Sequence, residues 1–121
     1  MTASKRKGEQ LPRLSKKRIA EMIEQATVDA YGDSEQITGW LTMIEENLAV
    51  PFETKVLGVL ITVERVDLDG SEQIVAICRR GRVRQSLPII DLPMPMPLPD
   101  GAEWIEAYRD WRAASHPPGD P

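Results

Sequence analysis

This chain of 121 residues is expected to fold as an α+β domain, with an N-terminal helical hairpin packed on a small antiparallel β-sheet or partial barrel and a C-terminal helix. Three observations predict this architecture. Apolar residues repeat with the helical period before residue 50, residues 54–90 are rich in valine and isoleucine, and a helical repeat returns after residue 100. The length is that of one domain, expected at residues 15–114, between a disordered basic arm over 1–14 and a disordered tail over 115–121.

The first two helices are predicted from their apolar stripes. Residues 15–31 carry the first stripe, and we expect Gly32 to end this helix as a C-terminal glycine. The second helix opens at Asp33 or Ser34. Its apolar positions recur at helical spacing and are Ile37, Trp40, Leu41, Ile44 and Leu48. Because the link between the two helices is very short, they should form an antiparallel hairpin.

The middle of the chain has the composition of β-strands. Residues 54–66 read as one long bent strand or two short ones, since Gly58 lies inside the run. Residues 74–79 and 82–90 flank an Arg-Gly pair, which predicts a hairpin. These strands should form the small antiparallel sheet.

The last third of the chain contains a proline-rich segment and a final helix. Proline alternates with apolar residues over 93–99, so this segment should be extended. It is either a strap that packs methionine and leucine across the body or a ligand for a proline-recognising domain. The final helix should reach about residue 114, and its apolar face is formed by Trp104, Ile105, Tyr108 and Trp111.

Charge is distributed unevenly along the chain, whose net charge is −4. Residues 1–18 contain seven basic residues and one acidic residue, whereas residues 19–78 contain twelve acidic and two basic residues. An acidic body argues against nucleic acid as the main partner and is compatible with a hard cation. The basic arm is either a solvated tail or a nucleic-acid contact.

Several functional classes are excluded by composition. A single cysteine, Cys78, leaves no internal disulfide and no cysteine-rich zinc site, and a single histidine, His116, argues against a catalytic triad. The chain shows no phosphate-binding glycine loop and no catalytic carboxylate pair, so we do not expect an enzyme. Without a membrane-spanning apolar run or a secretory signal, we expect a cytoplasmic protein.

The first candidate metal ligands are Glu45, Glu46 and Asn47, which fall in the last turn of the second helix. The helix dipole makes this end negative, so acidic residues there are unfavourable by a few tenths of a kcal/mol each. A bound cation would reverse the sign of these terms, since carboxylate, amide and helix-end carbonyl oxygens are good calcium ligands. The alternative interpretation is an exposed acidic helix end without a ligand.

The second candidate group lies between two predicted strands and consists of Asp67, Asp69 and Glu72. Three carboxylates within six residues could surround a cation. The segment is not an EF-hand, because Glu72 stands where the loop requires glycine and Cys78 where it requires glutamate. The alternative is a plain acidic hairpin turn. A basic cluster over 79–84 is expected to pair with the excess carboxylates, a phosphate site being the alternative.

Several motifs together resemble the CcbP-type calcium-binding family. They are the segment 28–36 (Val-Asp-Ala-Tyr-Gly-Asp-Ser-Glu-Gln), Gly39-Trp40, the segment 44–48 (Ile-Glu-Glu-Asn-Leu), Pro51-Phe52 and a tryptophan-containing C-terminal segment over 104–111. The acidic pair that this family carries before leucine falls on Glu45 and Glu46.

The resemblance implies a small cytoplasmic calcium-binding protein that holds the ion with clustered surface carboxylates rather than EF-hands. We expect Ca²⁺ to be bound by the two groups above acting from two segments, with Glu53 as an added ligand. The protein would then be a calcium buffer or sensor. The competing hypothesis is a non-enzymatic protein–protein interaction module that has lost metal binding and engages a protein partner.

Overall fold

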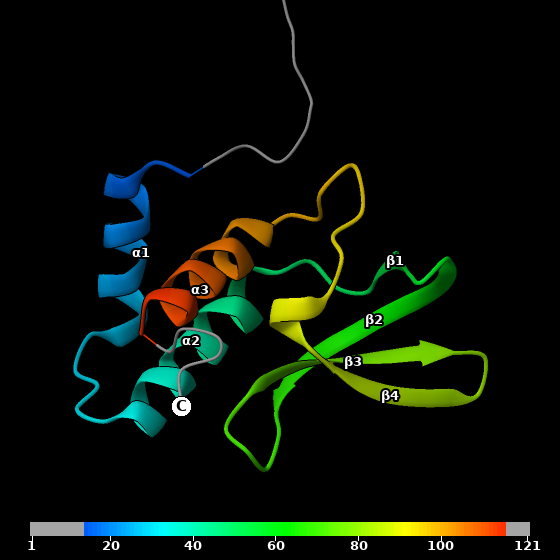
Figure 1. The fold of residues 1–121 in the computed structure, drawn as a ribbon, viewed down its shortest axis with the longest axis horizontal. Helices are drawn as coiled ribbons and strands as arrows, with labels where there is room; N and C mark the ends of the chain where they lie inside the picture. The colour runs from blue at the N-terminus through cyan, green and yellow to red at the C-terminus, as the bar shows by residue number, and fades with distance from the viewer. Residues whose placement is uncertain (1–13, 116–121) are drawn as a thin grey trace, which may run out of the picture.

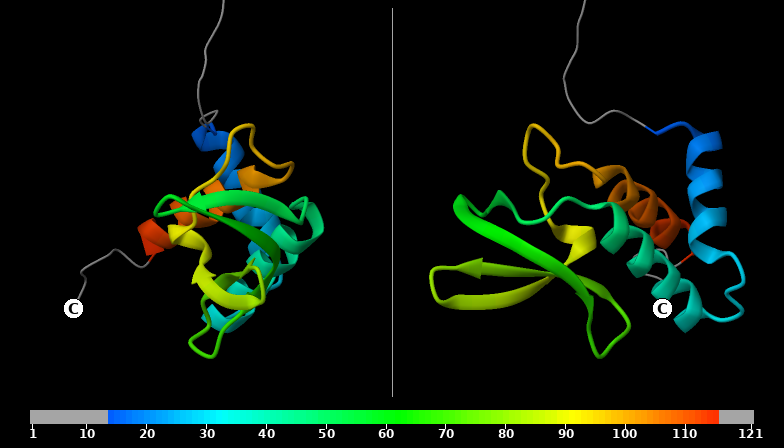
Figure 2. Two further views of the ribbon diagram at one scale, coloured as in Figure 1. Left: turned by 90° about the vertical axis from the view of Figure 1, so that its right-hand side faces the viewer. Right: turned by 180° about the vertical axis from the view of Figure 1, so that it is seen from behind.

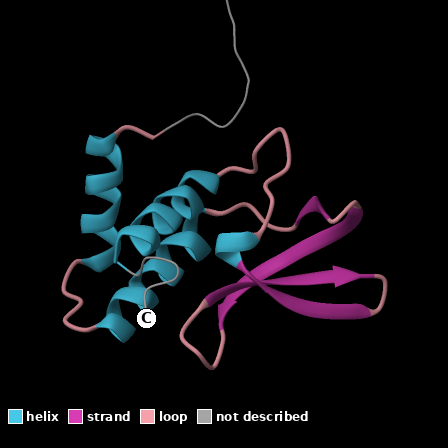
Figure 3. Cartoon of the chain, viewed as in Figure 1, coloured by secondary structure: helices cyan, strands magenta, loops and turns pink. Residues whose placement is uncertain are grey.

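The computed structural model describes residues 14–115, and its helices and strands follow one another in the predicted order (Figures 1 and 3). The predicted arm and tail lie outside these residues except for their innermost positions, 14 and 115. The helices and strands are α1 (Lys16–Thr27), α2 (Asp33–Asn47), β1 (Phe52–Val56), β2 (Val59–Leu68), β3 (Ile74–Arg80), β4 (Val83–Pro88), the 3-10 helix η2 (Ile89–Asp91) and α3 (Ala102–Ser115). The α+β class is therefore confirmed.

The four strands form one antiparallel sheet in the order β1-β2-β3-β4. The predicted strand over 54–66 is two strands, because Leu57 and Gly58 both take positive φ angles, 51° and 79°, and turn the chain back on itself. A register shift between Val63 and Arg65 adds a bulge to β2. The sheet is open, with β1 and β4 as its edges, so the partial barrel does not form.

Within residues 14–115, the helices cover one part of the sheet and leave the tips of the β1–β2 and β3–β4 hairpins uncovered (Figures 1 and 2). Helix α2 packs against β2, and both α1 and α3 pack against α2. The approach of α1 to α2 is close, since a Cβ atom at Gly39 would lie 1.9 Å from the carbonyl oxygen of Ala26. Glycine is therefore required at this helix–helix contact.

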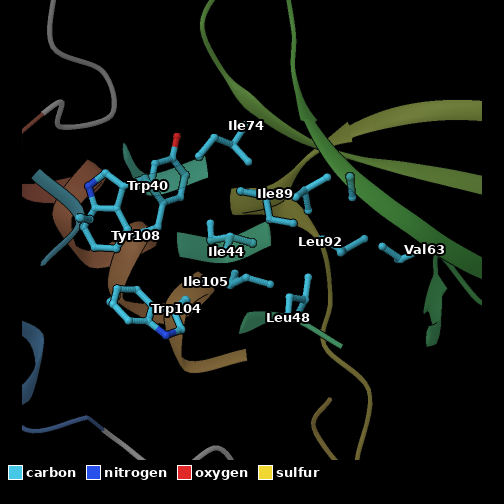
Figure 4. Packing of buried hydrophobic residues seen from close by; sticks show 14 of the residues in the cluster. Trp40, Ile44, Leu48, Val63, Ile74, Ile89, Leu92, Trp104, Ile105 and Tyr108 are labelled. Atoms are coloured by element: carbon cyan, nitrogen blue, oxygen red, sulfur yellow. The ribbon is translucent and has the colours of Figure 1, made fainter. Parts of the chain in front are cut away.

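Trp40 is fully buried and lies beside Tyr108 at one side of the core (Figure 4). Its ring makes edge contacts with Trp104 and Tyr108 at centroid distances of 6.2 and 5.7 Å, a favourable aromatic geometry. Trp111 lies at 5.7 Å from the same ring. The aromatic residues predicted on the second and last helices thus join those two helices into one core.

The link between α1 and α2 differs from its prediction. Helix α1 ends at Thr27, not near residue 31, and the following turn places Asp29 at a φ of 61°. Asp tolerates this left-handed conformation better than most residues. Gly32 has an extended φ of −151° and precedes α2 as its N-cap. The prediction that Gly32 ends the first helix is therefore wrong, because Asp29 makes the turn instead.

The proline-rich segment forms a strap between η2 and α3 that bends at Met96 and Pro97, so it is not extended throughout as predicted (Figure 1). The Thr54 hydroxyl donates to the Pro93 carbonyl oxygen at 2.7 Å, and Met94 packs against the core. Met96 is exposed, so only part of the strap is held. Among the described helices, none is long and apolar enough to cross a membrane.

Candidate metal-binding site

The C-terminal turn of α2 presents Glu45, Glu46 and Asn47 to solvent. The helix ends there because Leu48 leaves helical geometry with a ψ of 124°, while its N–H still donates to the Ile44 carbonyl oxygen at 2.8 Å. The predicted trio therefore lies at a helix end.

Within residues 14–115, the negative charge at this end of α2 is uncompensated. Its last turn holds no basic residue, and within residues 14–115 neither Glu45 nor Glu46 has an ion-pair partner. The carbonyl oxygens at a helix C-terminus carry partial negative charge, which adds to that of the two carboxylates. The amide nitrogen of Asn47 donates to the Met43 carbonyl oxygen at 2.8 Å, so its amide oxygen is the atom left to accept. All of these groups attract a cation.

The tertiary fold brings a further acidic residue to the same end. The N–H of Ala49 donates to the carbonyl oxygen of Asp100 at 2.8 Å, although the two residues are distant in sequence. A Cβ atom at Gly101 would lie 2.0 Å from the Asn47 carbonyl oxygen, so the loop before α3 touches the last turn of α2. Local sequence patterns carry no signal for this neighbour, because it depends on how α3 docks.

The second predicted group, in the turn between β2 and β3, is occupied by hydrogen bonds of its own. One carboxylate oxygen of Asp69 accepts from the N–H groups of Ser71 and Gln73 at 2.8 and 3.0 Å. Asp67 accepts from the N–H of Leu68 at 2.8 Å, and its other carboxylate oxygen lies 3.8 Å from an Arg65 guanidinium nitrogen. These carboxylates thus accept hydrogen bonds from the backbone of the turn, a common role of aspartate in turns.

Glu72 shows which end of α2 this turn faces. Its carboxylate accepts a hydrogen bond from the Ser34 hydroxyl, in the first turn of α2. Glu45 is eleven residues further along the helix, which at 1.5 Å per residue places it roughly 17 Å away. The structure therefore sets the two predicted groups at opposite ends of one helix and does not bring them together.

One ion cannot be held by both groups, because calcium ligands lie about 2.3–2.6 Å from the ion. In the part of the chain that the structure describes, no group of three or more Asp, Glu, His or Cys side chains is arranged to hold a metal. The added candidate, Glu53, lies exposed on β1. A site at the end of α2 would thus depend on the two glutamates, the amide oxygen of Asn47 and backbone carbonyl oxygens.

Two of the four arginines in the basic cluster, Arg79 and Arg84, are paired as predicted, whereas Arg80 and Arg82 have no ion-pair partner among residues 14–115. Glu64 accepts hydrogen bonds from the guanidinium groups of Arg84 and Arg79 at 2.8 and 2.7 Å. The bond from Arg84, then that from Arg79, lowers the pKa of Glu64 below its ordinary value. Cys78 is buried in the sheet, and burial raises the pKa of its thiol, which makes it a poor nucleophile.

The comparisons with known proteins bear on this arrangement. The model of the CcbP-type calcium-binding family, described as "Calcium binding", matches residues 17–112, well over half of the chain. No curated protein and no solved structure matches the chain. The matched residues include both ends of α2, the sheet and most of α3.

Proposed function

The chain belongs to the CcbP calcium-binding family, and from this premise we propose that it binds Ca²⁺ through the exposed carboxylates at the C-terminal end of α2. Its role would be that of a calcium buffer or sensor rather than an enzyme. The observation that carries the proposal is the exposed pair Glu45 and Glu46 at a negative helix end, without a compensating cation among residues 14–115.

Helix electrostatics favours this end of α2 over the other. A cation at the C-terminus interacts favourably with the helix dipole, whereas one at the N-terminus is repelled. The turn residues Asp67, Asp69 and Glu72 lie on the repulsive side and already accept hydrogen bonds. We therefore propose the turn as a separate and weaker site, where calcium must compete with the turn's own bonds.

Calorimetric titration of the full chain with calcium chloride tests the proposal. Two matched variants each remove two negative charges: Glu45→Gln/Glu46→Gln at the end of α2 and Asp67→Asn/Glu72→Gln at the turn. We expect heat of binding and a calcium-dependent rise in melting temperature for the wild type and the turn variant. The helix-end variant should lose the tighter binding step and most of the rise in melting temperature, and it should keep only the weak binding of the turn.

Two results would overturn the proposal. Millimolar calcium that leaves the wild-type heat and melting curve unchanged would mean that this chain does not bind the ion. Loss of binding in the turn variant alone would move the site to the β2–β3 turn. Magnesium in place of calcium serves as the control for nonspecific charge screening.

The alternative function is a non-enzymatic protein-interaction module that no longer binds metal. It is favoured by an apolar groove that residues of the β1–β2 and β3–β4 hairpins line and that no element of residues 14–115 fills. For such a module, both double variants would change stability alone, and calcium would have no effect on any of the three proteins.

A further inference from the structure

The sheet extends past the helices at the tips of its two hairpins. The turn between β1 and β2 and the turn between β3 and β4 lie at the end of the sheet farthest from α1 (Figures 1 and 2). Leu57, at the first tip, is almost completely exposed. The tips are therefore free of the helical layer that covers the other end.

The inner face of the sheet stays apolar beyond the helices. Side chains of a strand alternate between faces, so the residues in register with buried Cys78 and Val63 mark the inner face. At the tips this face carries five apolar residues together with the polar Gln85 and Arg80; the apolar ones are Val56, Val59, Ile61, Val83 and Leu87. They line a groove of about 610 Å³ between the two hairpins.

The inner face is mainly apolar at the tips, whereas the opposite face of the same strands carries charged groups. The opposite face carries the ion pairs of Glu64 with Arg79 and Arg84. An antiparallel sheet usually turns its polar face to solvent and its apolar face to a packing partner. No described element covers the tips, and Val83 is 62% exposed, so the apolar side of the groove lacks such a partner within residues 14–115.

Two arginines, Arg79 and Arg80, line the apolar groove, and only Arg80 lacks an acidic partner within residues 14–115. Arg80 lies on the inner face and lines the groove, and it has no acidic partner among the described residues. Its neighbours Arg79 and Arg84 are both held by Glu64 on the opposite face. The groove therefore combines an apolar floor with an uncompensated guanidinium group.

The geometry points to a docking site for an extended peptide segment of a partner protein, with alternating apolar side chains and a carboxylate that meets Arg80. The edges of the open sheet, β1 and β4, flank the groove and can hydrogen-bond an added strand. An acyl chain could not use these bonds. A second copy pairing through β4 would bring another Arg84 but no acidic side chain to meet Arg80, because β4 carries no carboxylate. This inference is independent of calcium binding.

Selection of short random peptides displayed on phage against the full-length chain tests the docking site. Enriched peptides, fluorescently labelled, are then measured by anisotropy with the wild type and four variants. We expect peptides that alternate apolar residues and contain an acidic residue. Val83→Gln should weaken their binding about tenfold, since it removes an apolar contact in the groove, and Arg80→Gln should weaken it several-fold.

Two matched controls separate the groove from general surface effects. Leu60→Gln removes an exposed apolar side chain from the opposite face of β2, and Arg82→Gln removes a cation that does not line the groove. Both should bind like the wild type. All four substituted side chains are exposed, so we expect every variant to fold, which thermal melts followed by circular dichroism would check.

Three outcomes would overturn the inference: no peptide is enriched, enriched peptides bind all variants equally, or they are basic rather than acidic. Sedimentation equilibrium tests the remaining possible occupant of the groove, which is a second copy of this chain. A wild-type dimer that Val83→Gln dissociates would make the groove an interface between copies of this chain, and the peptide site would be rejected.

Discussion

Removing the two negative charges from the end of α2 should stabilise the calcium-free protein and destabilise the calcium-bound one. Near a helix C-terminus each carboxylate costs about 0.3–1 kcal/mol at low ionic strength. Glu45 and Glu46 are both exposed, which places each near the lower bound, so Glu45→Gln/Glu46→Gln should gain about 0.6 kcal/mol. Glutamine and glutamate have similar helix propensities, so this difference is electrostatic. For a domain of this size it raises the melting temperature by about 2–5 °C.

Calcium should reverse the order of stability. An ion present at a hundred times its dissociation constant stabilises the wild type by about 2.7 kcal/mol, and the variant would not gain this. Thermal unfolding followed by circular dichroism, first with a chelator and then with calcium, measures both differences. The variant should melt above the wild type in the first condition and below it in the second.

The matched control lies at the other end of the same helix. Asp33 and Glu35 occupy the first turn of α2, where negative charge is favourable. Asp33→Asn/Glu35→Gln should therefore lower the melting temperature with and without calcium. The reasoning would be refuted if the helix-end variant were no more stable than the wild type in chelator. A difference that did not shrink with added salt would refute it as well.

Three further predictions concern the fold. Gly39→Ala should destabilise the protein by about 2 kcal/mol in urea unfolding, because the added Cβ would lie 1.9 Å from the Ala26 carbonyl oxygen. The control variant Gly70→Ala should be nearly neutral, since there is open space around Gly70. Glu64 has a pKa lowered from its ordinary value of 4.5, so its pairs stabilise the folded state above that pH and lose this effect as the pH falls through the folded-state value. The stability difference between the wild type and Glu64→Gln should therefore narrow below about pH 4.5 in a series of thermal melts, and a constant difference would contradict the pairing. Thr54→Val removes a buried hydrogen bond to the proline-rich strap and should lower the free energy of unfolding by about 1 kcal/mol. An unchanged free energy of unfolding would show that this contact does not stabilise the fold.

Local sequence patterns were sufficient to predict the type and order of the helices and strands and much of the core. The apolar stripe of α2 appears in the structure as buried Ile37, Trp40 and Ile44, because helical period alone decides which side of a helix is apolar. The end of α1 was misplaced for a local reason. Both Gly32 and Asp29 can make the turn, and only the packed structure selects Asp29.

Sequence by itself determined the α+β class, the acidic end of α2 and the motifs of a calcium-binding family, since each of these depends on spacing along one segment. Tertiary structure alone decided which segments meet. It placed the β2–β3 turn at the N-terminal end of α2 through Glu72 and Ser34, and it brought Asp100 to the C-terminal end. The reason is that the length of a helix separates its two ends. Acidic side chains at opposite ends of α2 are therefore too far apart to bind one ion together.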